Sequence, residues 1–351
     1  MSGQPLTELV NRSKELFDGT DLLIAGDVAD PQLLSLCKNC HLADVITDNY
    51  VTFRQMAAML AQTATDSIMQ TVTYKHLSVH FGVPDELKDK LKSYNCALLF
   101  LQKNKNSTVK LLSFLSAKLP PKSRVYLAGA NSGGGKSAYR LLEAAGTPFK
   151  VDSARKCTLF GLRVEHDFPA AAAISQITTA DKISLYQSPD VFSCGKLDEG
   201  TALLLTELSQ VKSGKSALDL GCGCGVVGIS LKKAGFESVT CVDVSASALL
   251  LTAKNAQLNK VDLTVKPSDM LSNTATYDLI AVNPPFHQGL AQDRSPTLEM
   301  LSTVPQHLNP QGVLYLVGNN FLKYERVLKT VFSSVEIVRA NSRFSVIKAT
   351  M

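Results

Sequence analysis

The residues of this sequence best suited to chemistry lie between Asp219 and Phe286. Asp219 ends a short apolar run, glycines follow at positions 221, 223 and 225, and the pattern becomes helical from Val226. Glycine lets the backbone approach a ligand closely because no Cβ intervenes, and the free N–H groups of a helix start face that ligand. The spacing therefore predicts a strand, a glycine turn and a helix that together bind a small molecule.

A second acid and a short proline motif follow this turn. The apolar segment 238–244 contains Asp243, about 20 residues past the glycines, where an acid suits ribose hydroxyls. A later apolar segment, 279–282, runs directly into the motif made of Asn283, Pro284, Pro285 and Phe286. Because ligands of open parallel sheets bind at the carboxyl ends of the strands, we expect these groups to share one site.

Two cofactors are compatible with the glycines. Gly223, Gly225 and Gly228 satisfy G-x-G-x-x-G, so an NAD-dependent oxidoreductase stays an alternative. S-adenosylmethionine is favoured, because Asp219 stands where an acceptor can hold the cationic amino group of a methionine moiety. The combination with the proline motif resembles the amino-methyltransferase superfamily, whose motif is [DNS]-P-P-[FYW]. The resemblance implies methyl transfer from S-adenosylmethionine to an amine.

Each residue of the proline motif has an expected catalytic role. The Asn283 side-chain carbonyl and the Pro284 backbone carbonyl can accept the two N–H bonds of an exocyclic amine, which points its lone pair at the methyl group. Pro284 and Pro285 stiffen the turn by fixing φ, and Phe286 offers a face on which a base can stack. Most of the rate would then come from positioning.

The expected cofactor contacts extend over the whole turn. Gly221, Gly223 and Gly225 would leave room for the methionine end. Asp219 would bind its amino group, and Asp243 would bind the ribose hydroxyls. Asp269 would accept from the adenine amino group, unless it caps a helix. The expected cofactor set is completed by Asn283. Asp198 and Thr201 are expected to cap the following helix and close the pocket.

Length and composition indicate the number of domains, the class of partner and the cellular compartment. A chain of 351 residues with 45% hydrophobic residues is expected to form two domains with sizeable cores. The net charge of +5 permits a polyanionic partner. The N-terminus has no apolar signal-peptide core and no apolar run reaches membrane-spanning length, which predicts a cytoplasmic protein without a membrane partner. Eight scattered cysteines indicate reduced thiols.

Strands alternate with helices from residue 21 to residue 164, and the same run of elements recurs from 216 to 349. The helices are expected to include 7–17 and 136–145. The segment 154–164 has strand character, and 153–164 is expected to be a strand pair, like 340–350 in the second half. The segment 124–131, RVYLAGAN, is similar to 313–320, VLYLVGNN. We therefore predict an α/β protein with two tandem Rossmann-like class I methyltransferase domains, 1–170 and 171–351. The first copy is predicted to be degenerate, because residues 26–28 lack the glycine series and 102–105 replace the proline motif.

Three other motifs are predicted to have structural and not catalytic roles. Cys37, Cys40 and His41 spell a c-type haem motif, yet haem attachment needs export, so they are expected to be helix-end residues and no metal is predicted. Residues 130–138 nearly spell a P-loop, but an alanine replaces the first glycine, so a glycine-rich turn is expected. His287 is expected to be a loop histidine, because the chemistry requires no general base.

The chain as a whole resembles the small-subunit ribosomal RNA methyltransferase C family, over nearly its full length. The resembling segments are 150–155, 191–193, 197–198, 219–226, 243–246, 283–289 and 320–324. The family implies methylation of N2 of a guanine in 16S rRNA, with an N-terminal domain that aids folding and RNA binding. We further expect a monomer acting on the assembled 30S subunit. Adenine N6, a protein glutamine, or a non-catalytic RNA-binding role remain alternatives.

Overall fold

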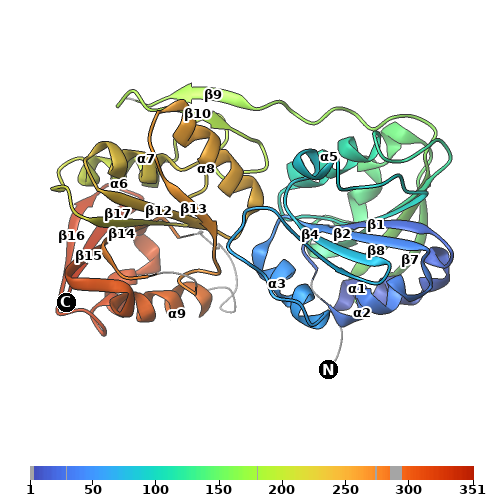
Figure 1. Ribbon diagram of the computed structural model, residues 1–351, viewed down its shortest axis with the longest axis horizontal. Helices are drawn as coiled ribbons and strands as arrows, with labels where there is room; N and C mark the ends of the chain where they lie inside the picture. The colour runs from blue at the N-terminus through green and yellow to red at the C-terminus, as the bar shows by residue number, and fades with distance from the viewer. Residues whose placement is uncertain (1–3, 29, 180, 273–274, 285–294) are drawn as a thin grey trace. The chain divides into compact units, whose positions relative to one another are not determined.

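The computed structural model describes residues 4–28, 30–179, 181–272, 275–284 and 295–351. The chain divides into two compact units, Met1–Ala173 and Ile174–Met351, each with its own sheet (Figure 1). Phe168 is buried in the hydrophobic core of the first unit, so residues 169–173 carry the chain out of it. No helix in the described ranges combines the length and apolar content needed to cross a membrane.

The first unit contains an eight-stranded sheet in the order β3-β4-β2-β1-β5-β6-β8-β7. Neighbours from β4 to β6 are parallel, whereas β3, β8 and β7 pair antiparallel. The strands are β1 (Asp21–Ala25), β2 (Leu42–Thr47), β3 (Gln70–Tyr74), β4 (Leu77–Phe81), β5 (Cys96–Phe100), β6 (Arg124–Ala130), β7 (Phe149–Ala154) and β8 (Cys157–Arg163). The α-helices are α1 (Pro5–Asn11), α2 (Pro31–Leu36), α3 (Tyr50–Met59), α4 (Pro84–Leu87) and α5 (Lys105–Leu115).

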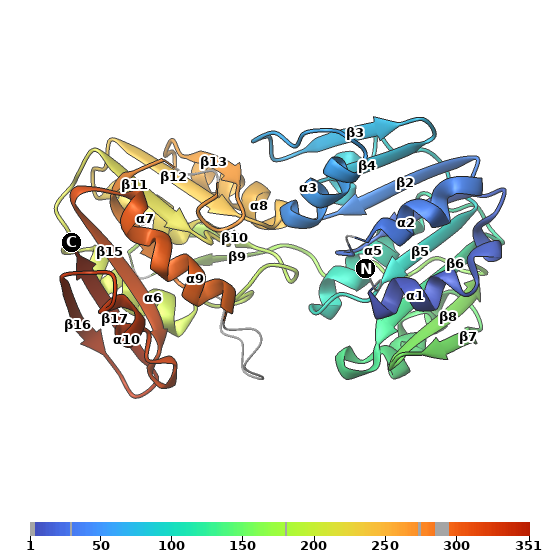
Figure 2. The ribbon, with the colours of Figure 1, turned by 90° about the horizontal axis from the view of Figure 1, so that it is seen from below.

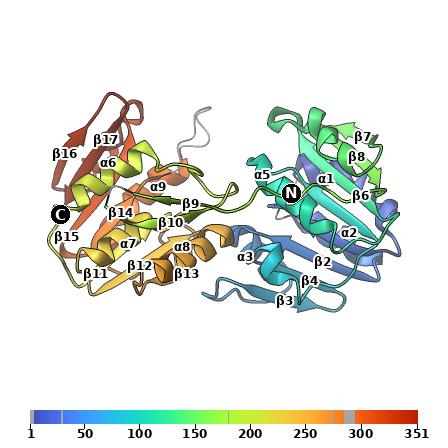
Figure 3. The ribbon, with the colours of Figure 1, turned by 90° about the horizontal axis from the view of Figure 1, so that it is seen from above.

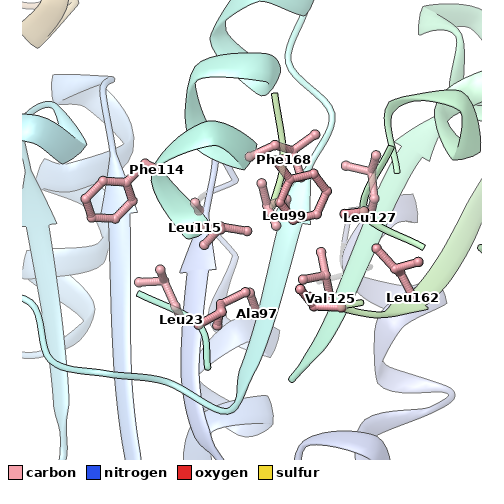
Figure 4. Close-up of a cluster of buried hydrophobic side chains, with 14 of the residues drawn as sticks. Leu23, Ala97, Leu99, Phe114, Leu115, Val125, Leu127, Leu162 and Phe168 are labelled. Atoms are coloured by element: carbon pink, nitrogen blue, oxygen red, sulfur yellow. The ribbon is translucent and has the colours of Figure 1, made fainter. Parts of the chain in front are cut away.

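One face of this sheet packs on α5 and on the segment that leaves the unit. Residues two apart on a strand point to the same face, which brings Ala97 and Leu99 of β5 into one layer. Figure 4 shows this layer together with Leu115 of α5 and with Phe168. Backbone N–H groups of the exit segment also donate to helix-end hydroxyls, as Phe168 does to Ser116 Oγ at 2.8 Å. Burial and hydrogen bonding thus attach this segment to the first unit.

The second unit contains a seven-stranded sheet in the order β13-β12-β11-β14-β15-β17-β16 and a two-stranded sheet of β9 and β10. The strands are β9 (Ser175–Thr178), β10 (Ser184–Gln187), β11 (Ser216–Leu220), β12 (Ser238–Asp243), β13 (Thr264–Pro267), β14 (Tyr277–Val282), β15 (Leu308–Asn319), β16 (Ser334–Ala340) and β17 (Phe344–Thr350). The α-helices are α6 (Glu199–Leu208), α7 (Val226–Lys233), α8 (Ala246–Leu258), α9 (Ser295–Thr303) and α10 (Tyr324–Leu328). Figure 3 shows α6, α7 and α8 over one face of the large sheet, and Figure 2 shows α9 on the other side.

The two large sheets have the same topology. From β4 to β7 the first repeats, strand for strand, the order of the second from β13 to β16, including the antiparallel last two strands; β3 is an addition at the edge. The predicted duplication of an α/β fold is therefore confirmed. The strand pair predicted at 153–164 is confirmed as the β7–β8 hairpin, although β7 begins earlier, at Phe149. The element prediction was wrong where β3 was missed and where 136–145 forms two 3-10 segments, Gly135–Leu141 and Glu143–Ala145. The predicted helix 7–17 is also interrupted, since α1 ends at Asn11 and a 3-10 segment, Lys14–Phe17, follows.

The strand registers match the two copies residue by residue. In each copy the first strand pairs in parallel with its two neighbours at equivalent positions. The matched pairs are Ile24 with Asp219, Thr47 with Asp243, and Phe100 with Asn283. The register also corrects the predicted replacement of the proline motif: it begins at Phe100, not at Gln102. The apolar side chains of Ile24 and Phe100 therefore stand where the second copy has an acid and an amide, and Thr47 stands where it has its second acid, so the first copy lacks all three groups.

Candidate active site

The glycine turn joins β11 to α7 with three residues in the left-handed region. Gly221, Gly223 and Gly225 have φ values of 75°, 55° and 81°. A Cβ added at Gly221 or Gly223 would meet nothing within 4 Å, whereas one at Gly225 would lie 2.7 Å from Thr252 Cγ2. The first two glycines thus leave open space beside the backbone, and the third permits close packing against α8. All three conformations disfavour other residues.

Gly228, the last glycine of the G-x-G-x-x-G pattern, is required for helix packing and not for its backbone conformation. It lies in α7, where an added Cβ would meet Cys241 Sγ of β12 at 2.3 Å. Its lack of a side chain lets the helix pack closely on the sheet. Its N–H donates to Asp219 Oδ2 at 2.8 Å. The third glycine of the pattern is therefore explained by packing and by the acid beneath it.

The two strand-end acids hold the turn and face the same space. Asp219 is 4% exposed, and burial raises its pKa to about 7, although the Gly228 N–H opposes that rise and the Asp243 charge adds to it. Asp243 accepts from the Gly223 N–H through Oδ2 and from the Ser245 N–H through Oδ1, each at 3.0 Å. Desolvation raises the pKa of Asp243 too, against those N–H groups. A buried and a partly buried carboxyl in one site favour a cationic ligand.

Asn283 follows β14 and is fixed by hydrogen bonds to a distant segment. Its Nδ2 donates to Asp198 Oδ2 at 3.1 Å and to Thr201 Oγ1 at 2.8 Å. Its Oδ1 is buried and accepts no hydrogen bond from any described residue. A buried carbonyl in this state is rare in proteins and points to a donor supplied by a ligand. Pro284, the next residue, is buried beside it.

A cavity of about 320 Å³ lies at the carboxyl ends of β11, β12 and β14 and brings these groups together. The predicted residues that line it are Asp219, Gly221, Gly223, Asp243, Asn283 and Pro284, with Asp198 and Thr201 opposite. Gly225 and Asp269 are not among the lining residues, although Ser268 and Met270 on either side of Asp269 are. The described residues 270–272 form a turn, so the alternative that Asp269 caps a helix is wrong. Pro285, Phe286 and His287 lie outside the described residues.

The predicted cap of α6 is confirmed. Asp198 is the N-cap residue of α6, and its Oδ2 accepts from the Thr201 N–H at 2.8 Å. The sequence signal was an acid three residues before a threonine at the start of an apolar run. The contact of both residues with Asn283, 82 and 85 residues away, had no such signal.

The loop that precedes α6 forms one rim of the cavity, and from this stretch sequence reasoning assigned only Asp198 and Thr201 to the pocket. Phe192, Ser193, Lys196 and Leu197 line it, and Phe192 is 64% exposed. The buried Gln187 fixes this loop: its Oε1 accepts from the Gly195 N–H, and its Nε2 donates to the carbonyls of Ser193 and Lys196. A glutamine at the end of a short strand gave no local signal, because its partners follow in an irregular loop.

The other motifs have structural roles. Cys37 begins a 3-10 segment directly after α2, and the Cys40 thiol donates to the Leu36 and Phe17 carbonyls, so both are helix-end residues as predicted. In the near-P-loop, a Cβ at Gly135 would lie 2.2 Å from Gly129 O, and 3-10 turns follow instead of an α-helix. The glycines of this loop therefore serve a tight turn.

Comparisons with known proteins match the chain along its whole length. A family model described as "Methyltransferase small domain" matches residues 182–348, and "Methyltransferase small domain N-terminal" matches 7–179. Proteins called "Ribosomal RNA small subunit methyltransferase C" are similar to it. The one from Pseudomonas entomophila is 33% identical, covering 99% of each chain. The one from Vibrio parahaemolyticus is 31% identical, covering 97% of this chain and 96% of that protein.

A solved structure shows the same fold. The T. thermophilus 16S rRNA N2 G1207 methyltransferase, in complex with AdoMet and guanosine, has a TM-score of 0.80 at 22% identity, covering 99% of this chain and 92% of that one. Fold, turn and family models together define a class, the methyltransferases with a small catalytic domain and an N-terminal companion domain. Within that class, the chain belongs to the ribosomal RNA small subunit methyltransferase C family. The predicted family is confirmed.

Proposed function

We propose that this protein transfers the methyl group of S-adenosylmethionine to the exocyclic N2 amine of a guanine in 16S rRNA. The T. thermophilus enzyme is named for guanine 1207, and we propose the equivalent base here. The observation that carries the proposal is the buried Asn283 Oδ1, an acceptor at the edge of the cavity that receives no hydrogen bond from the described residues. An amine N–H is the group that would satisfy it.

The residues of the cavity fit S-adenosylmethionine. The open side of Gly221 and Gly223 admits its methionine end, and the Asp219 carboxylate offsets the positive charge of its amino group. Asp243 accepts backbone N–H groups on both oxygens, and a carboxylate has about four acceptor sites, which leaves capacity for a ribose hydroxyl. Val226 and Val227 supply apolar surface. Asp269 remains our proposed acceptor for the adenine amino group, by way of the turn that Ser268 and Met270 bring to the cavity.

The chain positions the amine and stabilises its developing charge. When bound, the cofactor supplies an electrophilic methyl group. Asn283 Oδ1 and the Pro284 carbonyl accept the two N–H bonds, which directs the nitrogen lone pair at that methyl carbon. The N–C bond forms as the C–S bond breaks, its electron pair stays on sulfur, and the same acceptors stabilise the cationic nitrogen. The excess proton passes to water, so no general base is assigned. Pro285 and Phe286 keep their proposed roles in stiffening the turn and stacking the base.

We propose residues 171–351 as the catalytic domain and 1–170 as support for folding and RNA binding. The first copy has Ile24, Thr47 and Phe100 where the second has its acids and amide, which supports an inert first copy. We propose the assembled 30S subunit as substrate, a monomeric enzyme and a cytoplasmic location. Sedimentation of the purified protein tests the monomer.

Methyl transfer to defined particles tests the function. The protein is incubated with methyl-labelled S-adenosylmethionine and either unmodified 16S transcript or 30S subunits reconstituted from it. The rRNA is then digested and its nucleosides are separated by mass. N2-methylguanosine at one position, formed with 30S subunits, is the expected product. N6-methyladenosine, or label in a protein glutamine, would move the proposal to another acceptor. Absence of label from every fraction would contradict it.

A further inference from the structure

One carboxylate oxygen performs two tasks at the start of α6. Asp198 Oδ2 accepts from the Thr201 N–H at 2.8 Å and from Thr201 Oγ1 at 3.2 Å, which caps the helix. The same oxygen accepts from Asn283 Nδ2 at 3.1 Å, and Thr201 Oγ1 accepts from that amide at 2.8 Å. The three side chains form a closed set in which every amide hydrogen of Asn283 has an acceptor.

This set distinguishes the two orientations of the Asn283 amide. A primary amide turned by 180° would place Oδ1 against a carboxylate, which is acceptor-only when ionised, and would leave Nδ2 in the buried place of Oδ1. Both orientations leave one buried amide atom unsatisfied at the cavity, but only the turned form also loses the two Nδ2 hydrogen bonds and places an acceptor against the Asp198 carboxylate. That loss disfavours the turned form by roughly tenfold to a hundredfold. The amide is therefore held with its oxygen toward the cavity before any acceptor arrives.

We infer that Asp198 and Thr201 are positioning residues of the methyl transfer: they fix the Asn283 amide with its carbonyl toward the target amine. The inference rests on the proposed function and adds a second requirement to it. Without the pair, Asn283 would present N–H donors to an amine for part of the time, and the amine needs acceptors. The pair thus acts on the reaction through Asn283 and not through contact with the reacting atoms.

The antiparallel edge of the sheet keeps this pair in place. Gly200 packs on β17, where an added Cβ would lie 3.3 Å from Phe344 Cδ1 and 3.2 Å from Asp198 Oδ2. Glu199 pairs with Arg343 at 3.0 Å, and Glu207 pairs with Arg339 of β16. The exposed Glu199–Arg343 pair contributes little by itself, so the close packing at Gly200 and the partly buried Glu207–Arg339 pair are the main restraints. The first turn of α6 therefore cannot move away from Asn283 without losing these contacts.

Thr201→Val tests the inference, because valine keeps the shape of threonine and the backbone N–H that donates to Asp198. We expect kcat for 30S methylation to fall 10- to 100-fold while the Kd for S-adenosylhomocysteine stays within about threefold. Thr201→Ser keeps the hydroxyl and is expected to restore most of kcat. Thr206→Val is the matched control on the same helix, since that exposed hydroxyl bonds only the Ala202 carbonyl in the described structure, and it should leave kcat unchanged.

Asp198→Asn provides a second variant should valine at 201 prevent folding. Asparagine is an equally good N-cap residue, yet it can turn its own NH₂ toward Asn283, so a several-fold fall in kcat is expected with little change in melting temperature. Wild-type kcat in Thr201→Val and in Asp198→Asn would overturn the inference. Equal losses of kcat and of cofactor affinity would also overturn it, by showing a structural role. Failure of the proposed function would be visible separately, as an inactive wild type.

Discussion

Replacing Asp219 by asparagine tests whether the buried carboxyl beneath the glycine turn pairs with the charge of the cofactor. Asparagine keeps an oxygen for the Gly228 N–H but cannot ionise. An acid whose pKa is higher in the folded than in the unfolded protein binds its proton more tightly when folded. The free energy of unfolding therefore falls as pH rises between those two values. For Asp219 the window runs from 3.8 to about 7.

The window sets the size of two pH effects, one on stability and one on cofactor affinity. From pH 5 to pH 8, the cofactor-free wild type is expected to lose about 2–3 kcal/mol of stability relative to Asp219→Asn. Cofactor affinity has the opposite sign, because a cationic amino group requires the ionised carboxylate. S-adenosylhomocysteine should bind the wild type about tenfold more tightly at pH 8 than at pH 6, and should bind Asp219→Asn weakly and equally at both. Calorimetry and denaturant unfolding at each pH measure the two effects.

Asp262→Asn serves as the control, because Asp262 is an exposed acid of the same unit. It should keep the pH dependence of the wild type in both measurements. If Asp219→Asn retained the tenfold change in affinity, the pairing of Asp219 with the amino group would be refuted. If it retained the loss of stability at high pH, the cause would lie in another buried group.

Four further changes test the remaining groups. Asn283→Ala should lower methyl transfer at least 100-fold while calorimetric affinity for the cofactor changes only a few-fold; near wild-type turnover would contradict the mechanism. Asp243→Ala should weaken cofactor binding by about 1.5–3 kcal/mol, and an unchanged calorimetric Kd would mean that it does not hold the ribose. Gly225→Ala should lower stability by roughly 1–3 kcal/mol in denaturant unfolding, since its φ is 81° and its Cβ would clash with Thr252. Residues 1–173, expressed alone, should show no thermal shift with S-adenosylmethionine; a shift would show that the first copy binds it.

The fold could be predicted because its determinants are local. A buried parallel strand, a glycine turn and a helix start are written within a dozen residues at 216–228, so their order and connection are visible in the sequence. The similarity of residues 21–164 to residues 216–349 then predicted the same fold for the N-terminal domain. The strand pair predicted at 153–164 is the β7–β8 hairpin, but its turn could not be placed from the sequence, for an equally local reason. Its turn is made by Arg155 and Lys156 at φ values of 51° and 58°, a conformation usually signalled by asparagine or glycine.

The site could be predicted only as far as its residues follow strands. Asp219, Asp243 and Asn283 each end a strand, so sheet topology alone places them at one edge. The orientation of the Asn283 amide depends on Asp198 and Thr201, which reach it through the packing of α6. Contacts between side chains more than 80 residues apart depend on tertiary packing, and no spacing in the sequence encodes them.

The apolar residues in the first copy limit how that domain could evolve a cofactor site again. Regaining a cofactor site there would require an acid in place of Ile24, which is 1% exposed on the central strand. That carboxylate would be buried before any cationic ligand could bind beside it, and burying an unpaired charge costs several kcal/mol. The amide in place of Phe100, which is also 1% exposed, would be a buried polar group without a ligand to satisfy it, at a cost of about 1–3 kcal/mol. Each of these two substitutions lowers stability before it can restore binding, so a duplicated domain that has placed apolar side chains at these positions loses stability at each single step back.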